Sequence, residues 1–364
     1  MRKLLLALFV ALLLAVPVLA ADEAAGLPTD FGAQALEESL DAETREALAD
    51  ASPTSGGDFG KTLLNILKTA LTRSQSGFRA AILSGGKLLA AGILCGFAAG
   101  ARDGALRLPA ILAGAFAITA LCTKDVHAMI GLARETVQKI SDFTTLLLPV
   151  LSTSLAASGG SVSAGALLAG GSVAMSVLTR LSSTLLIPLV YVYILLSAAE
   201  SACESAGLGK VRELVGWVVS LLIKGVCAAF TAYLSLTRIL SAPADAAAVK
   251  AAQAAFSGMV PVVGSILSDA SESLLAGAGL IRSAVGIFGM LAVLAIAAAP
   301  FLQLAAFYLV LKVAGAVSVD AVCGPHAALL SHLSTAMGYM LAIACSAIWM
   351  GIISASCFLQ AVVH

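Results

Sequence analysis

The sequence predicts an all-α fold, a polytopic bundle of helices integral to a membrane. Its 364 residues are 60% hydrophobic and 12% charged, whereas a soluble domain is about 45–50% apolar and about 25% charged. A soluble fold of this size cannot bury so much apolar surface, so the excess must face lipid or neighbouring helices. The chain has 5% aromatic residues and 33 glycines, which is typical of closely packed membrane helices and not of a membrane β-barrel.

The first twenty residues predict a signal peptide. Arg2 and Lys3 form a positive start, Leu4–Val16 is apolar, and Val18–Ala20 offers the small residues of a cleavage site. Cleavage after Ala20 would place the new N-terminus outside the cytoplasm. The alternative is that this segment stays attached as a first membrane span.

Residues 21–86 predict an acidic, partly helical segment on the extracytoplasmic side. Between Asp22 and Asp58 there are ten acidic residues and one basic residue, Arg45. A run of Ser, Pro, Thr and Gly at 52–57 then separates this part from an amphipathic stretch that begins at Lys61. We expect that stretch to lie along the membrane surface or on a partner.

Residues 87–243 and 284–364 predict membrane helices. A span needs about 20 apolar residues, so the first four of eight apolar stretches are short; they are either tilted hairpins, re-entrant segments or spans lengthened by flanking small residues. The stretch with Pro300 has room for one kinked span or a tight pair, and six to eight spans are expected. The eight stretches are Leu88–Ala101, Leu108–Cys122, Thr144–Ala157, Ala164–Leu178, Leu185–Ala199, Leu214–Leu236, Val285–Val317 and Ala336–Val363.

Residues 244–283 predict a long amphipathic segment. Apolar residues follow helical spacing from Val249 to Ile281, while polar residues such as Lys250 and Asp269 gather on the opposite face. Pro261 is expected to end or kink a helix. An interfacial or partner-binding role and a connecting helix pair that packs on the bundle explain this pattern equally well.

No pattern predicts catalytic, cofactor-binding or metal-binding residues. The tract Ser55–Thr62 ends in Gly-Lys-Thr like a phosphate-binding loop, but Ser55 replaces the first glycine and no strand precedes it. The seven cysteines form no C-x-x-C pair, and the four histidines do not form a ligand set. Enzymatic activity is therefore not expected.

Three charged residues stand at apolar depth. Lys224 lies midway through Leu214–Leu236, where an unpaired charge is costly. Its side chain either lines a pathway, or forms an ion pair with an acid on another helix, with Glu200 and Glu204 as nearby candidates in sequence, or its long aliphatic stem carries the charge to water. The latter is the simpler interpretation for Lys224, and the two acids are more typical of the end of a span.

One run of residues resembles a known family. It reads Ala244-Asp245, Val249-Lys250, Pro261-Val262-Val263-Gly264, Ser268-Asp269-Ala270 and Ala284-Val285-Gly286. This order is similar to the stage III sporulation protein AE family, most sharply from about Thr231 to Gly289 and more loosely along the whole membrane body.

The resemblance implies a non-enzymatic, multi-span component of the channel-like complex that joins the mother cell to the forespore and supports late forespore gene expression. It implies ring-forming subunits, a cytoplasmic ATPase and a forespore-membrane protein as partners, and a place in the mother-cell membrane around the forespore. No cofactor or nucleic acid is implied. The partner contact is expected in the amphipathic segment, at Phe256, Val260, Pro261, Val263, Gly264, Leu267 and Asp269.

The alternative is a stand-alone secondary transporter with a substrate path near Lys224. Transporters often contain internally repeated halves with broken helices, and no convincing repeat is visible here. Uptake by the purified protein alone would distinguish the two hypotheses.

Overall fold

The computed structural model describes residues 33–48, 59–100, 107–203, 205–259, 264–321 and 324–360. All secondary structure in these ranges is helical, which confirms the predicted all-α fold. Six helical segments of this part are long and apolar enough to cross a membrane, at the lower end of the expected six to eight. The predicted signal peptide, residues 1–20, lies outside the described residues.

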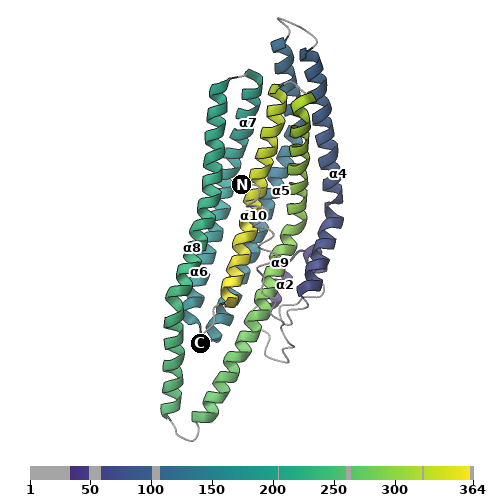
Figure 1. Ribbon diagram of the computed structural model, residues 1–364. Coiled ribbons are helices and arrows are strands. Elements are labelled where there is room, and N and C mark those ends of the chain that lie inside the picture. Colours follow the sequence, from purple (N-terminus) through teal and green to yellow (C-terminus); the bar gives the residue numbers. More distant parts are fainter. Residues whose placement is uncertain are drawn as a thin grey trace.

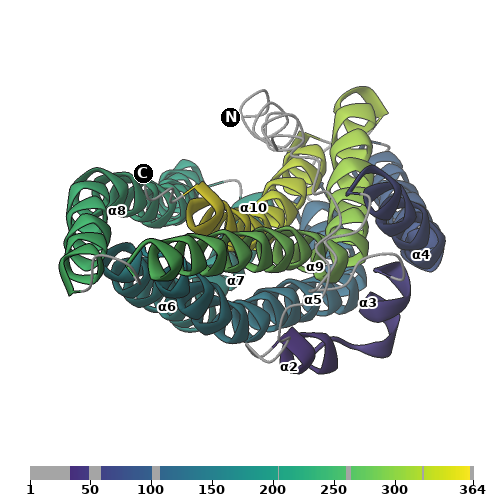
Figure 2. The ribbon, with the colours of Figure 1, turned by 90° about the horizontal axis from the view of Figure 1, so that it is seen from below.

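Long helical rods stand side by side and are joined by short connections at alternating ends (Figure 1). One rod, the last in the chain, lies in the middle of the bundle, with neighbours on several sides (Figure 2). It is α10, and it packs against α5, α7, α8 and α9. The long elements are α4 (Phe59–Gly100), α5 (Arg107–Ala157), α6 (Ser161–Leu181), η1 (Ser182–Leu186), α7 (Ile187–Cys203), α8 (Ala206–Met259), α9 (Gly264–Ala321) and α10 (Gly324–Gln360).

The short apolar stretches of the sequence are joined into longer helices. Both Leu108–Cys122 and Thr144–Ala157 lie in α5, so the hairpin or re-entrant alternative does not hold for this pair. The charged residues between them, such as Lys124 and Arg134, are exposed on one side of a continuous helix rather than placed in a loop. Similarly, Ala164–Leu178 and Leu185–Ala199 belong to one helical rod that runs from Ser161 to Cys203.

A π-helical turn, η1, joins the two halves of that rod. Ile187 donates its backbone N–H to the carbonyl of Ser182, five residues earlier. The next residue, Pro188, has no N–H to donate and its ring would collide with the carbonyl four residues back. Widening the turn by one residue accommodates the proline without ending the helix.

The helices are longer than a membrane crossing requires. At about 1.5 Å per residue, the 51 residues of α5 and the 54 residues of α8 extend over about 75–80 Å. The hydrocarbon layer is about 30 Å thick. A large part of each of these helices must therefore lie outside the hydrocarbon.

The amphipathic stretch that begins at Lys61 is the first part of α4. This helix runs without a break through residues 86 and 87, where the sequence suggested a division, and it runs alongside the other long helices of the bundle (Figure 1). Its buried side packs along α9. The residues on that side near the start of the helix are Thr62, Ile66, Ala70 and Ser74.

Two short helices of the acidic segment, α2 (Ala33–Glu38) and α3 (Ala42–Ala47), lie against the bundle. Arg73 of α4 forms an ion pair with Glu43 at 2.9 Å, and Lys139 of α5 forms one with Asp41 at 3.1 Å. Leu36, Leu40 and other apolar residues of this segment join the hydrophobic core. Both apolar packing and ion pairs therefore attach the acidic segment.

The segment 244–283 is divided between the end of α8 and the start of α9. Helix α8 continues through Pro243 to Met259, and α9 begins at Gly264, on either side of the expected break at Pro261. These two helix ends extend beyond the ends of the neighbouring rods (Figure 1). The segment thus forms a projecting helical pair that is continuous with two helices of the bundle.

Helices α9 and α10 pack most closely where glycine permits it. A Cβ added to Gly315 of α9 would lie 3.2 Å from the backbone nitrogen of Ser331 in α10. The obstacle is backbone, which cannot rotate away as a side chain could. The missing side chain therefore sets how near these two helices come.

Candidate functional site

A buried ion pair joins α7 and α8 close to the turn between them. Nε of Arg212 donates a hydrogen bond to Oε2 of Glu200 at 2.6 Å, and Nη1 of Arg212 donates one to the phenol oxygen of Tyr193 at 3.1 Å. The side chain of Arg212 is 10% exposed and that of Glu200 is 26% exposed. Because the guanidinium is nearly excluded from water, the carboxylate and the phenol replace the water that it loses.

Aromatic rings complete the surroundings of Arg212. The guanidinium carbon lies 5.6 Å from the centre of the Tyr193 ring, within cation–π range. The Tyr193 and Tyr339 rings meet edge to face, with centres 5.4 Å apart. Tyr339 belongs to α10, so the cluster reaches from the α7–α8 hairpin to the central helix.

Glycines on α8 make room for this cluster. A Cβ added to Gly209 would lie 2.5 Å from Oε1 of Glu200, and one added to Gly216 would lie 2.6 Å from the Tyr339 hydroxyl. The Gly-rich start of α8 is therefore explained by the acidic and aromatic side chains that α7 and α10 place against it.

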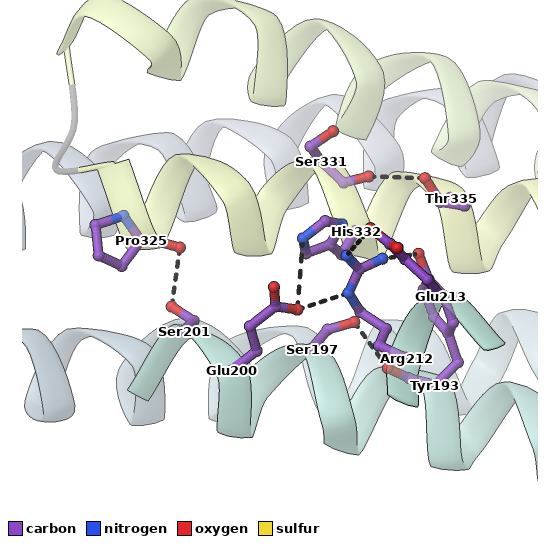
Figure 3. Close-up of polar contacts among 10 residues, drawn as sticks. All are labelled: Tyr193, Ser197, Glu200, Ser201, Arg212, Glu213, Pro325, Ser331, His332 and Thr335. Atoms are coloured by element: carbon purple, nitrogen blue, oxygen red, sulfur yellow. Dashed lines mark hydrogen bonds and ion pairs between the residues drawn. The ribbon is translucent and has the colours of Figure 1, made fainter. Parts of the chain in front are cut away.

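Helix α10 also contributes polar contacts to the cluster. Nε2 of His332 lies 3.9 Å from Oε2 of Glu200, and the Ser201 hydroxyl donates to the carbonyl of Pro325 at 2.9 Å (Figure 3). Glu213 is mostly exposed, and its carboxylate lies 3.8 Å from Nη2 of Arg212. We refer to Tyr193, Glu200, Arg212, His332 and Tyr339 as the Arg212 cluster. Its polar and aromatic contacts hold α7, α8 and α10 together.

A second polar site lies at the other end of the bundle, at the turn between α5 and α6. Gly159 in this turn has a φ of 95°, a conformation that other residues rarely adopt. The carboxylate of Asp245, in α8, accepts the N–H of Val162 at 2.8 Å and the N–H of Ser163 at 3.2 Å, together with the Ser163 hydroxyl. These N–H groups in the first turn of α6 have no partner within their own helix. Asp245, which is 2% exposed, thus caps α6 from another helix.

Helix α9 contacts the same turn. Nη1 of Arg282 donates a hydrogen bond to the Ser158 hydroxyl at 3.2 Å. Asp245 and Arg282 lie where the projecting parts of α8 and α9 leave the bundle. The base of the projecting pair is thereby fixed to the α5–α6 turn on both sides.

A small cavity lies between α4, α5, α9 and α10. Ser84 donates a hydrogen bond to the carboxylate of Asp125 at its edge. The cavity has a volume of about 10 Å³, the space of a single water molecule, and its other lining is apolar, including Phe307 and Met337. It is too small for an organic substrate.

Metal-ligating residues do not gather anywhere in the described part of the chain. No group of three or more His, Cys, Asp or Glu side chains with suitable geometry occurs there. One buried histidine, His326, places Nε2 3.0 Å from the carbonyl of Ile111 and packs against Gly114. Within the described residues, the hydrogen-bond partner of His326 is thus a backbone carbonyl.

Two of the residues predicted at apolar depth, Lys224 and Glu200, are not brought together. Glu200 pairs with Arg212, which the sequence analysis did not single out, and not with Lys224. Lys224 is exposed on α8, twelve residues or about 18 Å further along the helix than Arg212. Glu204 lies outside the described residues.

The predicted partner-contact residues fall at the tip of the projecting pair. Phe256 is in the last turn of α8, and Gly264, Leu267 and Asp269 are in the first turns of α9. The other predicted residues, Val260, Pro261 and Val263, lie outside the described residues. The contact therefore remains a prediction.

Sequence reasoning missed Arg212 and Asp245 as functional positions. Arg212 could have been found from its place, since it lies six residues after the start of α8, while Glu200 lies three residues before the end of α7 on the other side of the same turn. Asp245 carried no such signal, because its partner is the N-terminus of a helix that begins 84 residues earlier.

Comparisons with known proteins show similarity to one family. The profile of the family described as stage III sporulation protein AE matches residues 91–361. A curated relative, stage III sporulation protein AE of Bacillus subtilis (strain 168), is 26% identical over 225 residues. That match covers 61% of this chain and 56% of the relative, so it spans little more than half of the relative's length. No solved structure matches.

Proposed function

Because this chain belongs to the stage III sporulation protein AE family, we propose that it is a non-enzymatic, multi-span membrane component of a complex that joins the mother cell to the forespore. In this role it supports gene expression in the forespore after engulfment. The observation that carries the proposal is the family match, which extends over residues 91–361 and so includes α5 to α10 and the last ten residues of α4.

The fold is consistent with a subunit of an assembly. The Arg212 cluster and the Asp245 cap hold helices together, and the one cavity described above is water-sized. The Ser163 hydroxyl meets the Asp245 carboxylate, but both are buried and the carboxylate also accepts two backbone N–H groups of α6, so the contact has the form of a helix cap and not of the nucleophile and base that a hydrolase or transferase presents to a substrate. A scaffold or channel component needs fixed helices instead.

We place the protein in the mother-cell membrane that surrounds the forespore. Its proposed partners are ring-forming subunits, a cytoplasmic ATPase and a protein of the forespore membrane. The projecting pair formed by the ends of α8 and α9 is the proposed contact surface, because it extends beyond the rest of the bundle and is fixed at its base by Asp245 and Arg282 (Figure 1).

The proposal is tested by a clean deletion of the gene in the native host. Expression of a forespore-specific late reporter is scored after engulfment, with a mother-cell reporter of the same stage as control. We expect the forespore reporter to be lost and to return when the intact gene is supplied. Normal forespore expression in the deletion strain would reject the proposal.

The partner surface has its own test in the same strain. Charged substitutions at Phe256, Val263 and Leu267 should abolish complementation while the protein still accumulates in the membrane. Full complementation by this variant would show that the contact lies elsewhere. Solute uptake into liposomes by the purified chain alone would favour a stand-alone transporter.

A further inference from the structure

Helix α8 is the least covered of the six candidate spans. In its most apolar 18-residue window, 17% of the residues are buried inside the protein, compared with 50–61% for the windows of α5, α9 and α10. The helix lies at the edge of the bundle, with α6, α7 and α10 on one side (Figure 2). One face is exposed along most of its span: Leu214, Trp217, Leu221, Lys224, Ala228 and Ala232.

Lys224 on this face falls inside the membrane-crossing part of α8. The 20 residues that follow Glu213, Leu214–Tyr233, contain a single charged residue, which is Lys224 near their middle. About 20 residues are needed to cross the hydrocarbon layer. The candidate span of α8 is Gly207–Thr237, and because it is 31 residues long with Lys224 near its centre, any crossing of about 20 residues within it includes Lys224.

The described part of the chain supplies no carboxylate to Lys224. The nearest described acids in sequence, Glu213 and Asp245, stand 11 and 21 residues away along the same helix, and Glu200 of α7 is already paired with Arg212. A charged group within a membrane span is costly unless it is paired or reaches water. An acidic group from outside the chain would remove that cost.

The side chains on the same face are small on the C-terminal side of Lys224. A Cβ added to Gly225 would have no atom within 4 Å, and Ala228 and Ala232 follow on the exposed side. Small residues at this spacing allow the backbone of another helix to approach closely. Trp217 and Leu221, which are 60% and 51% exposed, offer larger contact area on the other side of Lys224.

We propose that this face of α8 binds a membrane-spanning helix of a different protein, which carries an Asp or Glu at the depth of Lys224. A second copy of this chain fits poorly, because a two-fold contact centred on this face would bring two Lys224 side chains together. The inference rests on the proposed function, since it assigns one contact of the proposed complex. It concerns a surface separate from the projecting pair.

The test uses sporulating cells of the native host and a photo-crosslinking amino acid at position 228 of the full chain. The crosslinked protein is identified, and the variants Lys224→Arg, Lys224→Met and Lys224→Glu are compared at equal membrane levels. Lys210→Glu, on the exposed surface near the start of the same helix, is the matched control. Removing one partner of a desolvated charge pair typically costs several kcal/mol, so we expect crosslinking to fall roughly tenfold or more with Met and Glu. It should persist with Arg and in the control.

Charge reversal provides the decisive step. Changing the single carboxylate in the partner's membrane helix to Lys should restore crosslinking to the Lys224→Glu chain. Crosslinking only to lipid, or to a second copy of this chain, would overturn the proposal. An unchanged crosslinking yield in the Lys224→Glu variant would overturn it as well. If Lys224→Glu supports normal reporter expression while the deletion does not, the proposed function stands and this surface assignment fails.

Discussion

Nε of Arg212 lies 2.6 Å from Oε2 of Glu200, and the two residues face each other across the turn that joins α7 to α8. The pair is mostly buried, and each partner has further polar contacts in the Arg212 cluster. Because the two charged side chains pair with each other, each can be accommodated in a helix that is otherwise mostly apolar.

Arg212→Met should destabilise the protein. It leaves the Glu200 carboxylate without its hydrogen-bond donor, at an expected cost of about 1–3 kcal/mol in the free energy of unfolding. Thermal unfolding of the purified protein in detergent measures this cost. Glu213→Gln is the control, because Glu213 is 72% exposed and lies 3.8 Å from the guanidinium. Equal effects of the two substitutions would contradict the role given to the buried pair.

Gly216→Ala should also destabilise the protein, although alanine is the better helix former. The new methyl group would lie 2.6 Å from the Tyr339 hydroxyl and 3.2 Å from the Tyr193 ring. Overpacking of this kind costs about 1–3 kcal/mol. Gly131→Ala in α5 is the matched control, since nothing lies within 4 Å of its added Cβ. A stabilised Gly216→Ala protein would mean that both rings can move aside.

Asp245→Ala should loosen the start of α6. It removes the acceptor for the N–H groups of Val162 and Ser163, and loss of a helix N-cap costs about 1–2 kcal/mol. Hydrogen exchange of residues 161–164, measured by mass spectrometry of the corresponding peptides, should become faster. Asp245→Asn keeps one acceptor oxygen and should have a smaller effect. The control Asp142→Ala removes an exposed acceptor of Gln138 and should leave this region unchanged.

Lys139→Met should change stability little. The ion pair with Asp41 is 3.1 Å long, but the two side chains are 48% and 61% exposed. Exposed pairs of this kind contribute between zero and about 1 kcal/mol and weaken with salt. Unfolding measured at low and high ionic strength tests this, and any difference from the unsubstituted protein should disappear at high salt. A large loss at both salt concentrations would contradict the small contribution expected of this exposed ion pair.

Composition predicted the fold class, because 60% hydrophobic residues leave no soluble alternative. The number of helices was harder to predict. The hydropathy pattern separates Leu108–Cys122 from Thr144–Ala157, yet both stretches belong to α5, in which charged residues between them, such as Arg134, are exposed. Hydropathy averages over all sides of a helix, so a one-sided polar stretch is mistaken for a break.

The polar sites could be predicted only in part. Glu200 was chosen from its charge at apolar depth, but its partner depends on how α8 turns back along α7, and a hydropathy pattern does not contain that information. The Asp245 cap was beyond reach, because its partners are backbone N–H groups, which every residue except proline possesses.

The Asp245 cap also sets an order of assembly. Ser163 precedes Asp245 by 82 residues, so during synthesis α6 is made well before the carboxylate that caps it. Until then, the first turn of α6 has unsatisfied N–H groups that only water or lipid headgroups can serve. The α5–α6 turn therefore reaches its final form late, when α8 arrives and closes a long loop in the chain.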